Sequence, residues 1–228
     1  MRELEETGNY VLLDQYGNPV ARRSYAPVAE LMGDQLRGVD YLVAAAGSGA
    51  SGAGVTEPYR AVFPEMRLVG VDTFNSTLFG LPDGERILRG LGNSLMPANL
   101  RHELYDEVDW LSAPLAFAAT RRLYRESGLF RGPTTGAARW VARSIAMRQP
   151  DARVVMLSAD SGMRYIDDVF CDEWLHEHGA FMASESMPEM PVAVNHPSAA
   201  EPPWSMFDWG RRPYAEVMTV GDIARRPA

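Results

Sequence analysis

The most constraining feature of the sequence is a short apolar run that is followed directly by a glycine-rich turn. The run is Tyr41–Ala46 and the turn is Gly47–Gly54. Two further apolar runs, Arg67–Asp72 and Arg153–Ser158, also end at turn-forming residues. Apolar runs of this length bounded by turn signals are typical of buried strands. Since predicted helices separate them, the pattern predicts parallel βαβ units in an α/β fold.

The chain divides into three parts, and all of the predicted helices lie in the second. Helices are expected at 27–36, 54–63, 115–127, 132–148 and 165–178, with mostly loops at 73–105. Residues 1–25 form a polar lead-in, and residues 26–183 form the α/β domain. Residues 184–228 are a Pro- and Met-containing extension with three large aromatic side chains, Trp204, Phe207 and Trp209. The aromatic side chains favour docking of this extension onto the domain or onto a partner over a loosely ordered tail.

Composition and charge exclude several classes of function. The net charge of −8 disfavours a nucleic-acid or anionic-membrane partner. No run approaches the ~18 apolar residues of a membrane span, and the acidic start does not resemble a signal peptide. Cys171 is the only cysteine, which excludes an internal disulfide and suits the cytoplasm. The four histidines show no metal-ligand spacing.

The chain contains no lysine. Lysine and arginine together number 22, and all 22 are arginine. Codon bias explains such a replacement, but the chemical consequence is independent of its cause. Arginine stays protonated in proteins and does not act as an amine nucleophile. No side chain of this sequence can therefore form an imine with an aldehyde.

The glycine-rich turn has the properties of a phosphate site. Gly47 and Gly49 let backbone amides approach an anion closely, and Ser48 and Ser51 add hydroxyl donors. The N-terminus of the following helix adds partial positive charge. The simpler alternative is a tight turn without a ligand.

The turn also fits a dinucleotide fingerprint. Gly47, Gly49 and Gly52 have the G-x-G-x-x-G spacing, and Asp72 ends the next predicted strand, where a ribose-binding acid is expected. An NAD-binding domain is thus an alternative. The turn lacks the GK[ST] sequence of a nucleoside-triphosphate P-loop.

Several segments in a fixed order resemble one enzyme family. They are Asp14–Pro19, Val39–Val43 with the turn after it, Leu68–Asp72, Gly90–Pro97, Gly128–Ala138, Ser158–Tyr165 and Asp172–Leu175. Together they resemble the C-terminal, large-domain part of the cysteine synthase and cystathionine β-synthase family of fold-type II pyridoxal-phosphate (PLP) enzymes. The resemblance implies a three-layer α/β domain with a mostly parallel sheet, similar to the tryptophan synthase β subunit and incomplete on its own.

The resemblance also implies a cofactor, pyridoxal 5'-phosphate, and a set of residues that bind it. The residues implied are Gly47, Ser48, Gly49, Ala50 and Ser51 for the phosphate, Gly90 and Leu91 beside the cofactor, and Asp160 or Ser161 at the pyridine nitrogen. The choice favours Ser161, because the family carries serine in this turn. Ala159 departs from the family's proline, so this alignment is open to a shift of one position. Thr134 and Thr135 either cap a helix or line the pocket.

The lysine-bearing N-terminal half of the family has no counterpart in these residues. The leading hypothesis is a split PLP enzyme of amino-acid metabolism, a lyase or transferase that carries out β-replacement or β-elimination on a serine- or cysteine-like amino acid. A partner chain would supply the Schiff-base lysine and share the cofactor in a hetero-oligomer, and this chain would contribute no catalytic residue. We also expect an apolar sheet edge and face to lie uncovered without the partner. A non-catalytic regulatory subunit, and a homo-oligomer that binds another phosphate ligand, are the alternatives.

Overall fold

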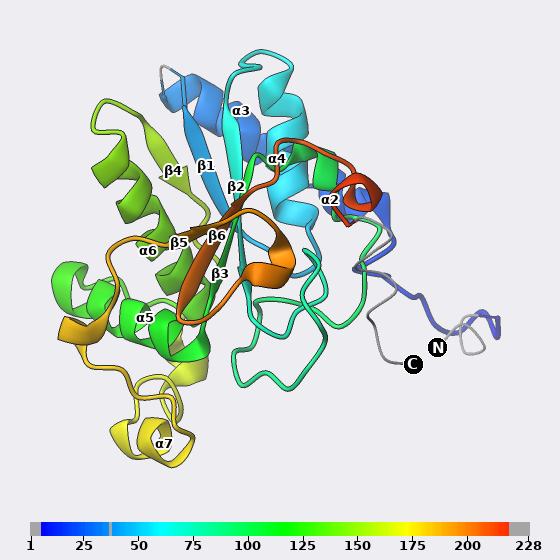
Figure 1. Cartoon of the computed structure of the whole chain (residues 1–228). Helices are drawn as coiled ribbons and strands as arrows, with labels where there is room; N and C mark the ends of the chain where they lie inside the picture. The colour runs from blue at the N-terminus through cyan, green and yellow to red at the C-terminus, as the bar shows by residue number, and fades with distance from the viewer. Residues whose placement is uncertain (1–5, 37, 219–228) are drawn as a thin grey trace.

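The computed structural model describes residues 6–36 and 38–218, which form one six-stranded sheet flanked by helices (Figure 1). The strands lie in the order β4-β1-β2-β3-β6-β5. Their bounds are β1 Tyr41–Ala45, β2 Arg67–Thr73, β3 Glu107–Leu111, β4 Val154–Met156, β5 Val192–Val194 and β6 Trp204–Asp208. The first four strands run parallel, β6 is antiparallel to β3, and β5 is parallel to β6. The predicted α/β class with a mostly parallel sheet is confirmed.

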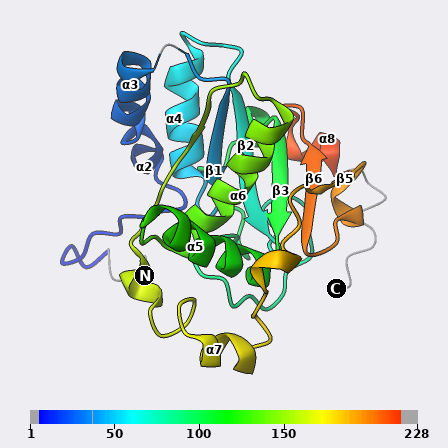
Figure 2. The ribbon, with the colours of Figure 1, turned by 90° about the vertical axis from the view of Figure 1, so that its left-hand side faces the viewer.

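Helices cover both faces of the sheet. Their bounds are α2 Pro19–Arg23, α3 Ala26–Gln35, α4 Ala50–Arg60, α5 Ala113–Ser127, α6 Pro133–Arg148, α7 Asp172–Glu177 and α8 Tyr214–Val217. Short 3-10 helices lie at His102–Leu104, Gly162–Tyr165, Ser184–Ser186 and Pro197–Ala199. Figure 2 shows the α3–α4 pair and the α5–α6 pair as separate layers.

The alternation of side chains along each strand builds two hydrophobic cores. On β1, Val43 faces the α5–α6 layer, whereas Leu42 and Ala44 face the α3–α4 layer. All three are at most 1% exposed. Because both faces are packed against helices, the expected uncovered apolar face is not found in the described part of the chain. The edge strand β4 is partly exposed, since its three residues are only half-buried.

The α5–α6 layer depends on one small residue. A Cβ atom at Gly136 would lie 2.5 Å from the Cα atom of Thr120, so only glycine lets the two helices approach this closely. The packed face of α5 includes Leu115, Phe117 and Leu123. The layer thereby fixes the N-terminus of α6 against the carboxyl end of the sheet.

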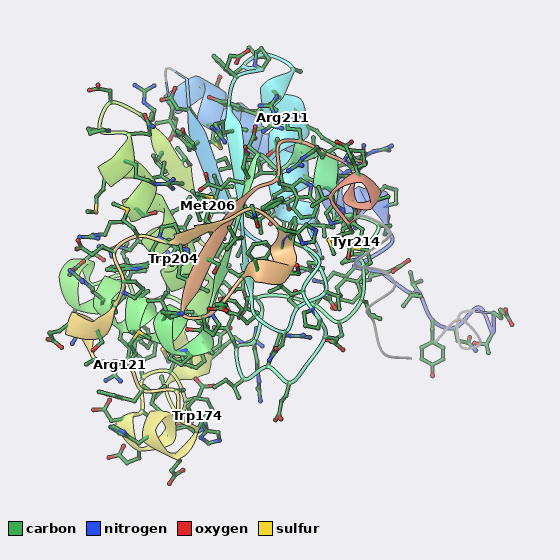
Figure 3. The ribbon with its side chains drawn as sticks, in the orientation of Figure 1. Arg121, Trp174, Trp204, Met206, Arg211 and Tyr214 are labelled. Carbon is green, nitrogen blue, oxygen red and sulfur yellow. The ribbon has the colours of Figure 1, made fainter. Side chains whose placement is uncertain are left out.

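The described part of the C-terminal extension, residues 184–218, contributes two strands to the sheet, and residues 219–228 lie outside the described residues. Its strand β6 pairs with β3 along five residues, and Trp204 and Trp209 are at most 1% exposed. Arg211 donates a 2.8 Å hydrogen bond to Asp106, which also pairs with Arg60 from α4. The aromatic side chains therefore dock onto this chain's own domain (Figure 3).

The predicted elements differ from the structure in two places. The strands β3, β5 and β6 were not expected at all. The predicted helix over 165–178 is wrong in most of its length: the structure has a 3-10 turn at Gly162–Tyr165, then α7 only from Asp172. The chain leaves helical geometry between them because Cys171 is extended, with φ −107° and ψ 116°.

Candidate cofactor site

A cavity of about 690 Å³ opens at the carboxyl end of β1. Its walls come from the N-terminal segment, the turn after β1, the loop after β2, the start of α6 and the segment after β4. The lining residues are Gln15, Tyr16, Tyr25, Val28, Ala45, Gly47, Ser48, Gly49, Ser51, Arg86, Gly90, Gly92, Asn93, Ser94, Thr134, Leu157, Ser158 and Ala159. Ligands of α/β proteins bind outside the carboxyl ends of parallel strands, where this cavity lies.

The glycine turn after β1 has one position, Gly49, at which the backbone tolerates only glycine. Gly49 caps α4 with a left-handed φ of +77°, and a Cβ atom there would lie 2.5 Å from the Cα atom of Leu100. Gly47 faces the carbonyl oxygen of Gly90, 3.5 Å from the position of a Cβ atom. The cap residue Gly49 offers no side-chain acceptor to the first turn of α4, where the amide of Ala50 donates a long 3.4 Å hydrogen bond to the hydroxyl of Ser48. The amides at this helix N-terminus can therefore bind an anion.

A second glycine turn supports the first. Gly90 and Gly92 both have left-handed backbone angles, with φ of +80° and +78°. The amide of Gly92 donates to the carbonyl of Ala46 at 2.8 Å, and Nδ2 of Asn93 contacts the carbonyl of Gly47 at 3.4 Å. The two turns are thus held together as one wall of the cavity.

Most of the residues expected at the phosphate lie in this wall. Gly47, Ser48, Gly49 and Ser51 line the cavity. Ala50 does not, because its side chain is 4% exposed and packs inward; its amide lies 3.4 Å from the hydroxyl of Ser48. Of the two residues expected beside the cofactor, Gly90 lines the cavity. Leu91 instead belongs to the hydrophobic core and is 1% exposed.

Asp160 and Ser161 lie next to the cavity rather than in its wall. Ser158 and Ala159 line it in their place. Asp160 accepts a 2.7 Å hydrogen bond from the hydroxyl of Tyr165, and burial together with this bond raises the pKa of Tyr165 to about 12. Ser161 accepts a hydrogen bond from the amide of Met163 at 3.3 Å and so caps a 3-10 turn.

Sequence reasoning missed the loop residues that complete the cavity. Arg86 donates to the hydroxyl of Ser94 at 2.6 Å and to Asp83 at 3.0 Å, which fixes the loop after β2. Tyr16 and Tyr25 extend the wall from the N-terminal segment. Tyr16 lies in the Asp14–Pro19 segment that resembles the family, although it was not singled out as a site residue. Tyr25 and Arg86 lie outside every such segment, and no periodic pattern joins them to the turn.

The position of Asp72 decides against the dinucleotide alternative. A ribose-binding acid must reach the ligand, but Asp72 is 0% exposed and does not line the cavity. Its Oδ1 atom accepts from the amide of Thr73 at 2.8 Å. Burial raises its pKa to about 7, against the lowering effect of the Thr73 amide and Ser76. Asp72 is thus a buried group behind the cavity wall.

A family model described as "Pyridoxal-phosphate dependent enzyme" matches residues 1–160. The chain belongs to this family. The similarity to cysteine synthases predicted from the sequence is confirmed, and the cofactor of the family is pyridoxal phosphate. The turn Gly47–Ser51, here called the glycine cradle, fits its phosphate, because it lines the cavity at the N-terminus of α4, where amides can bind an anion.

Curated relatives of this PLP-family chain are synthases. It is 31% identical over 198 residues to N-(2-amino-2-carboxyethyl)-L-glutamate synthase of Cupriavidus metallidurans. The aligned region covers 84% of this chain and 58% of the relative. It is 34% identical over 157 residues to a probable cysteine synthase of Bacillus subtilis, covering 67% of this chain and 50% of the relative. The chain therefore spans between half and two thirds of the length of these relatives.

Solved structures of the family agree. An O-acetylserine-dependent cystathionine β-synthase from Helicobacter pylori superposes with a TM-score of 0.66 at 28% identity, covering 73% of this chain and 56% of that one. O-ureido-L-serine synthase gives a TM-score of 0.68 at 26% identity, covering 77% and 60%. The fold is that of the fold-type II PLP enzymes.

The part of the chain that the structure describes holds neither a candidate metal site nor a candidate membrane-spanning helix. No group of three or more His, Cys, Asp or Glu side chains there could hold a metal ion. Within residues 6–36 and 38–218, no helix is long and apolar enough to cross a bilayer.

Proposed function

We propose that this chain is the phosphate-binding subunit of a two-chain PLP enzyme that carries out β-replacement or β-elimination on a serine- or cysteine-like amino acid. The observation that carries the proposal is the glycine cradle of the cavity wall in a chain without lysine. The lysine that holds the cofactor in this chemistry must come from outside these 228 residues. We assign it to a separate polypeptide in a hetero-oligomer, which we place in the cytoplasm.

Each part of the cavity has a role in this proposal. The amides of the Gly47–Ser51 turn, with the hydroxyls of Ser48 and Ser51, hold the phosphate. Gly90 gives a flat surface without a side chain where a planar ring can lie. The turn that starts at Ser158 faces the ring nitrogen; the assignment to Asp160 or Ser161 stays a prediction. The bound cofactor supplies an electron sink for charge developing on the substrate.

The substrate class follows from the relatives. O-ureido-L-serine synthase and O-acetylserine-dependent cystathionine β-synthase are named for serine derivatives. A serine derivative with a leaving group on its β-carbon is therefore the substrate class we propose. The chain itself binds and orients the cofactor, and the proton-moving amine belongs to the partner.

Equilibrium binding of PLP to the purified chain tests the cradle. We expect reversible binding, and Ser51→Ala should weaken it by roughly ten- to a hundredfold, since a hydrogen bond to a charged group contributes about 1.5–3 kcal/mol. Ser24→Ala is the matched control, because its hydroxyl bonds only to the carbonyl of Ala21 outside the cavity. A chain that binds no PLP, alone or with a partner, would favour the non-catalytic regulatory subunit.

A further inference from the structure

One positively charged side chain lies in the wall of the cavity that holds the glycine cradle, here called the first cavity. Among the described residues, Arg86 is the only charged one that lines this cavity, and its side chain is 16% exposed. No Asp or Glu side chain lines the same wall. A cation without an acidic neighbour in a cavity wall attracts anionic ligands.

Arg86 also lines a second cavity, of about 520 Å³, at the carboxyl ends of β2 and β3. Its Nη2 atom donates to the hydroxyl of Ser94 at 2.6 Å, and Ser94 lines the first cavity. Its Nη1 atom donates to the carbonyl of Asn75, and Asn75 lines the second cavity. The guanidinium therefore lies where the two cavities meet.

The guanidinium of Arg86 has donors left for a ligand. Nη1 donates to the carbonyls of Asn75 and Gly84 and to the carboxylate of Asp83, whereas Nη2 donates only to Ser94. In the described part of the chain Nε donates to no protein atom, and it is not among the buried atoms that lack a partner, so water or a ligand can reach it. The Nε–Nη2 edge of a guanidinium matches the two oxygens of a carboxylate.

The acidic partner of Arg86 does not compete for this edge. Asp83 lies 3.0 Å from Nη1, and its side chain is 52% exposed. The hydrogen bond from Arg86 lowers the pKa of Asp83, so the pair is charged at neutral pH. Exposed ion pairs of this kind contribute little, because water screens them. A ligand carboxylate at the Nε–Nη2 edge therefore adds to the pair and does not have to displace it.

The loop after β2 orients the guanidinium in advance. Nδ2 of Asn75 donates to the carbonyl of Glu85 at 2.9 Å, and the amide of Gly84 donates to the carbonyl of Asn75 at 3.2 Å. Because Nη1 of Arg86 is anchored on this loop, the opposite edge has a fixed direction. A ligand that binds to it orders less of the side chain and loses less entropy.

The second cavity suits an organic ligand. Its volume lies in the range of small-molecule sites, which are mostly apolar with a few polar groups. The acidic residue of its lining, Glu85, is exposed, so solvent screens its charge. The apolar side chains that line it and are not fully buried are those of Phe74, Ile87, Ala113 and Pro202.

We infer that Arg86 binds the carboxylate of an acceptor substrate, a small organic acid whose carbon skeleton occupies the second cavity while the cofactor occupies the first. The inference rests on the proposed function and narrows it, because β-replacement takes an acceptor and β-elimination does not. The phosphate of the cofactor is bound elsewhere, at the glycine cradle.

NMR of the arginine Nε–H groups in the full chain tests the inference. Propionate and its neutral analogue propionamide are titrated in parallel, with and without saturating PLP. We expect saturable shifts of the Arg86 Nε signal with propionate, also when PLP is bound, and none with propionamide. Equal shifts with both compounds would show that the charge is not recognised and would overturn the inference. A propionate shift that PLP abolishes would assign Arg86 to the cofactor and would also overturn it.

Two variants measure the contribution of the guanidinium, with the amide of Asn75 as the reporter. Arg86→Gln should weaken propionate binding by roughly ten- to a hundredfold, as expected for a lost hydrogen bond to a charged group. Arg143→Gln is the matched control, because Arg143 pairs with the exposed Glu189 at 3.1 Å and lines neither cavity. Equal affinities in the two variants would contradict the assignment.

Asp83→Asn separates ligand binding from a purely structural role of Arg86 in the loop. If Arg86 binds the carboxylate, loss of the nearby negative charge should leave propionate binding unchanged or make it tighter. If Arg86 only holds the loop, loss of its ion-pair partner should weaken propionate binding, which would overturn the inference. PLP binding without any propionate shift at Arg86 overturns the inference alone. Propionate shifts at Arg86 in a chain that binds no PLP support the carboxylate site and contradict the proposed function.

Discussion

The indole Nε1 of Trp204 donates a 2.7 Å hydrogen bond to Oδ1 of Asp109, and both side chains are at most 1% exposed. The bond joins β6 of the C-terminal extension to β3 in the centre of the sheet. Burial, and then the charge of Glu107, raises the pKa of Asp109 well above its usual range. The bond to Trp204 acts against this rise and gives the buried carboxyl a donor.

Trp204→Phe should lower the free energy of unfolding by about 1–3 kcal/mol, because it leaves a buried acceptor without its donor. Urea unfolding of the variant and of the native chain measures the difference. Trp174→Phe is the control, since Trp174 is only half-buried and stacks on His178. Equal losses in the two variants would contradict the role of the bond.

Gly49→Ala should destabilise the chain and abolish PLP binding, because the new Cβ atom collides with Leu100 and the backbone is left-handed. Gly128→Ala isolates the backbone effect. Gly128 has a φ of +70° and no atom within 4 Å of a Cβ position, so its cost should be limited to about 1–2 kcal/mol. Thermal unfolding and PLP titration of both variants check this, and a Gly49→Ala chain that binds PLP normally would contradict the cradle.

Asp72 should make stability depend on pH. The carboxyl of Asp72 has a pKa of about 7 in the folded chain, against an ordinary value of 3.8 that applies to the unfolded chain. Between these two pH values the folded chain therefore binds more protons than the unfolded chain. The free energy of unfolding should therefore fall as the pH rises from about 4 to about 7. Asp72→Asn should remove this part of the slope. Urea unfolding at several pH values measures the difference between the two chains; parallel pH profiles would show that Asp72 does not titrate in this window.

The parts of the site that could be predicted are local in sequence. The Gly47–Ser51 turn joins β1 directly to α4, so strand, turn and helix signals follow one another along the chain. The strand β3 was missed because its carboxylates, Glu107 and Asp109, hide the apolar alternation. Their burial depends on Arg148, 3.2 Å from Glu107, and on Trp204, which are distant in sequence.

The cavity-lining residues in the turn after β4 could not be predicted for a related reason. Resemblance identified the turn after β4, but the residues that line the cavity are Ser158 and Ala159. The direction of each side chain is set by contacts such as the one between Asp160 and Tyr165. Such contacts form only when the turn packs against the rest of the domain. A sequence motif therefore locates the turn but does not show which of its side chains line the cavity.

In the proposed two-chain enzyme, another polypeptide supplies the lysine that holds the cofactor. The direct test is to purify the tagged chain with its natural companions, reduce the complex with borohydride, and locate the modified residue by mass spectrometry. We expect a pyridoxyl phosphate group on a lysine of a different polypeptide. The modification found instead only on the N-terminal amine of this chain, or on a lysine in a longer form of the same polypeptide, would contradict it.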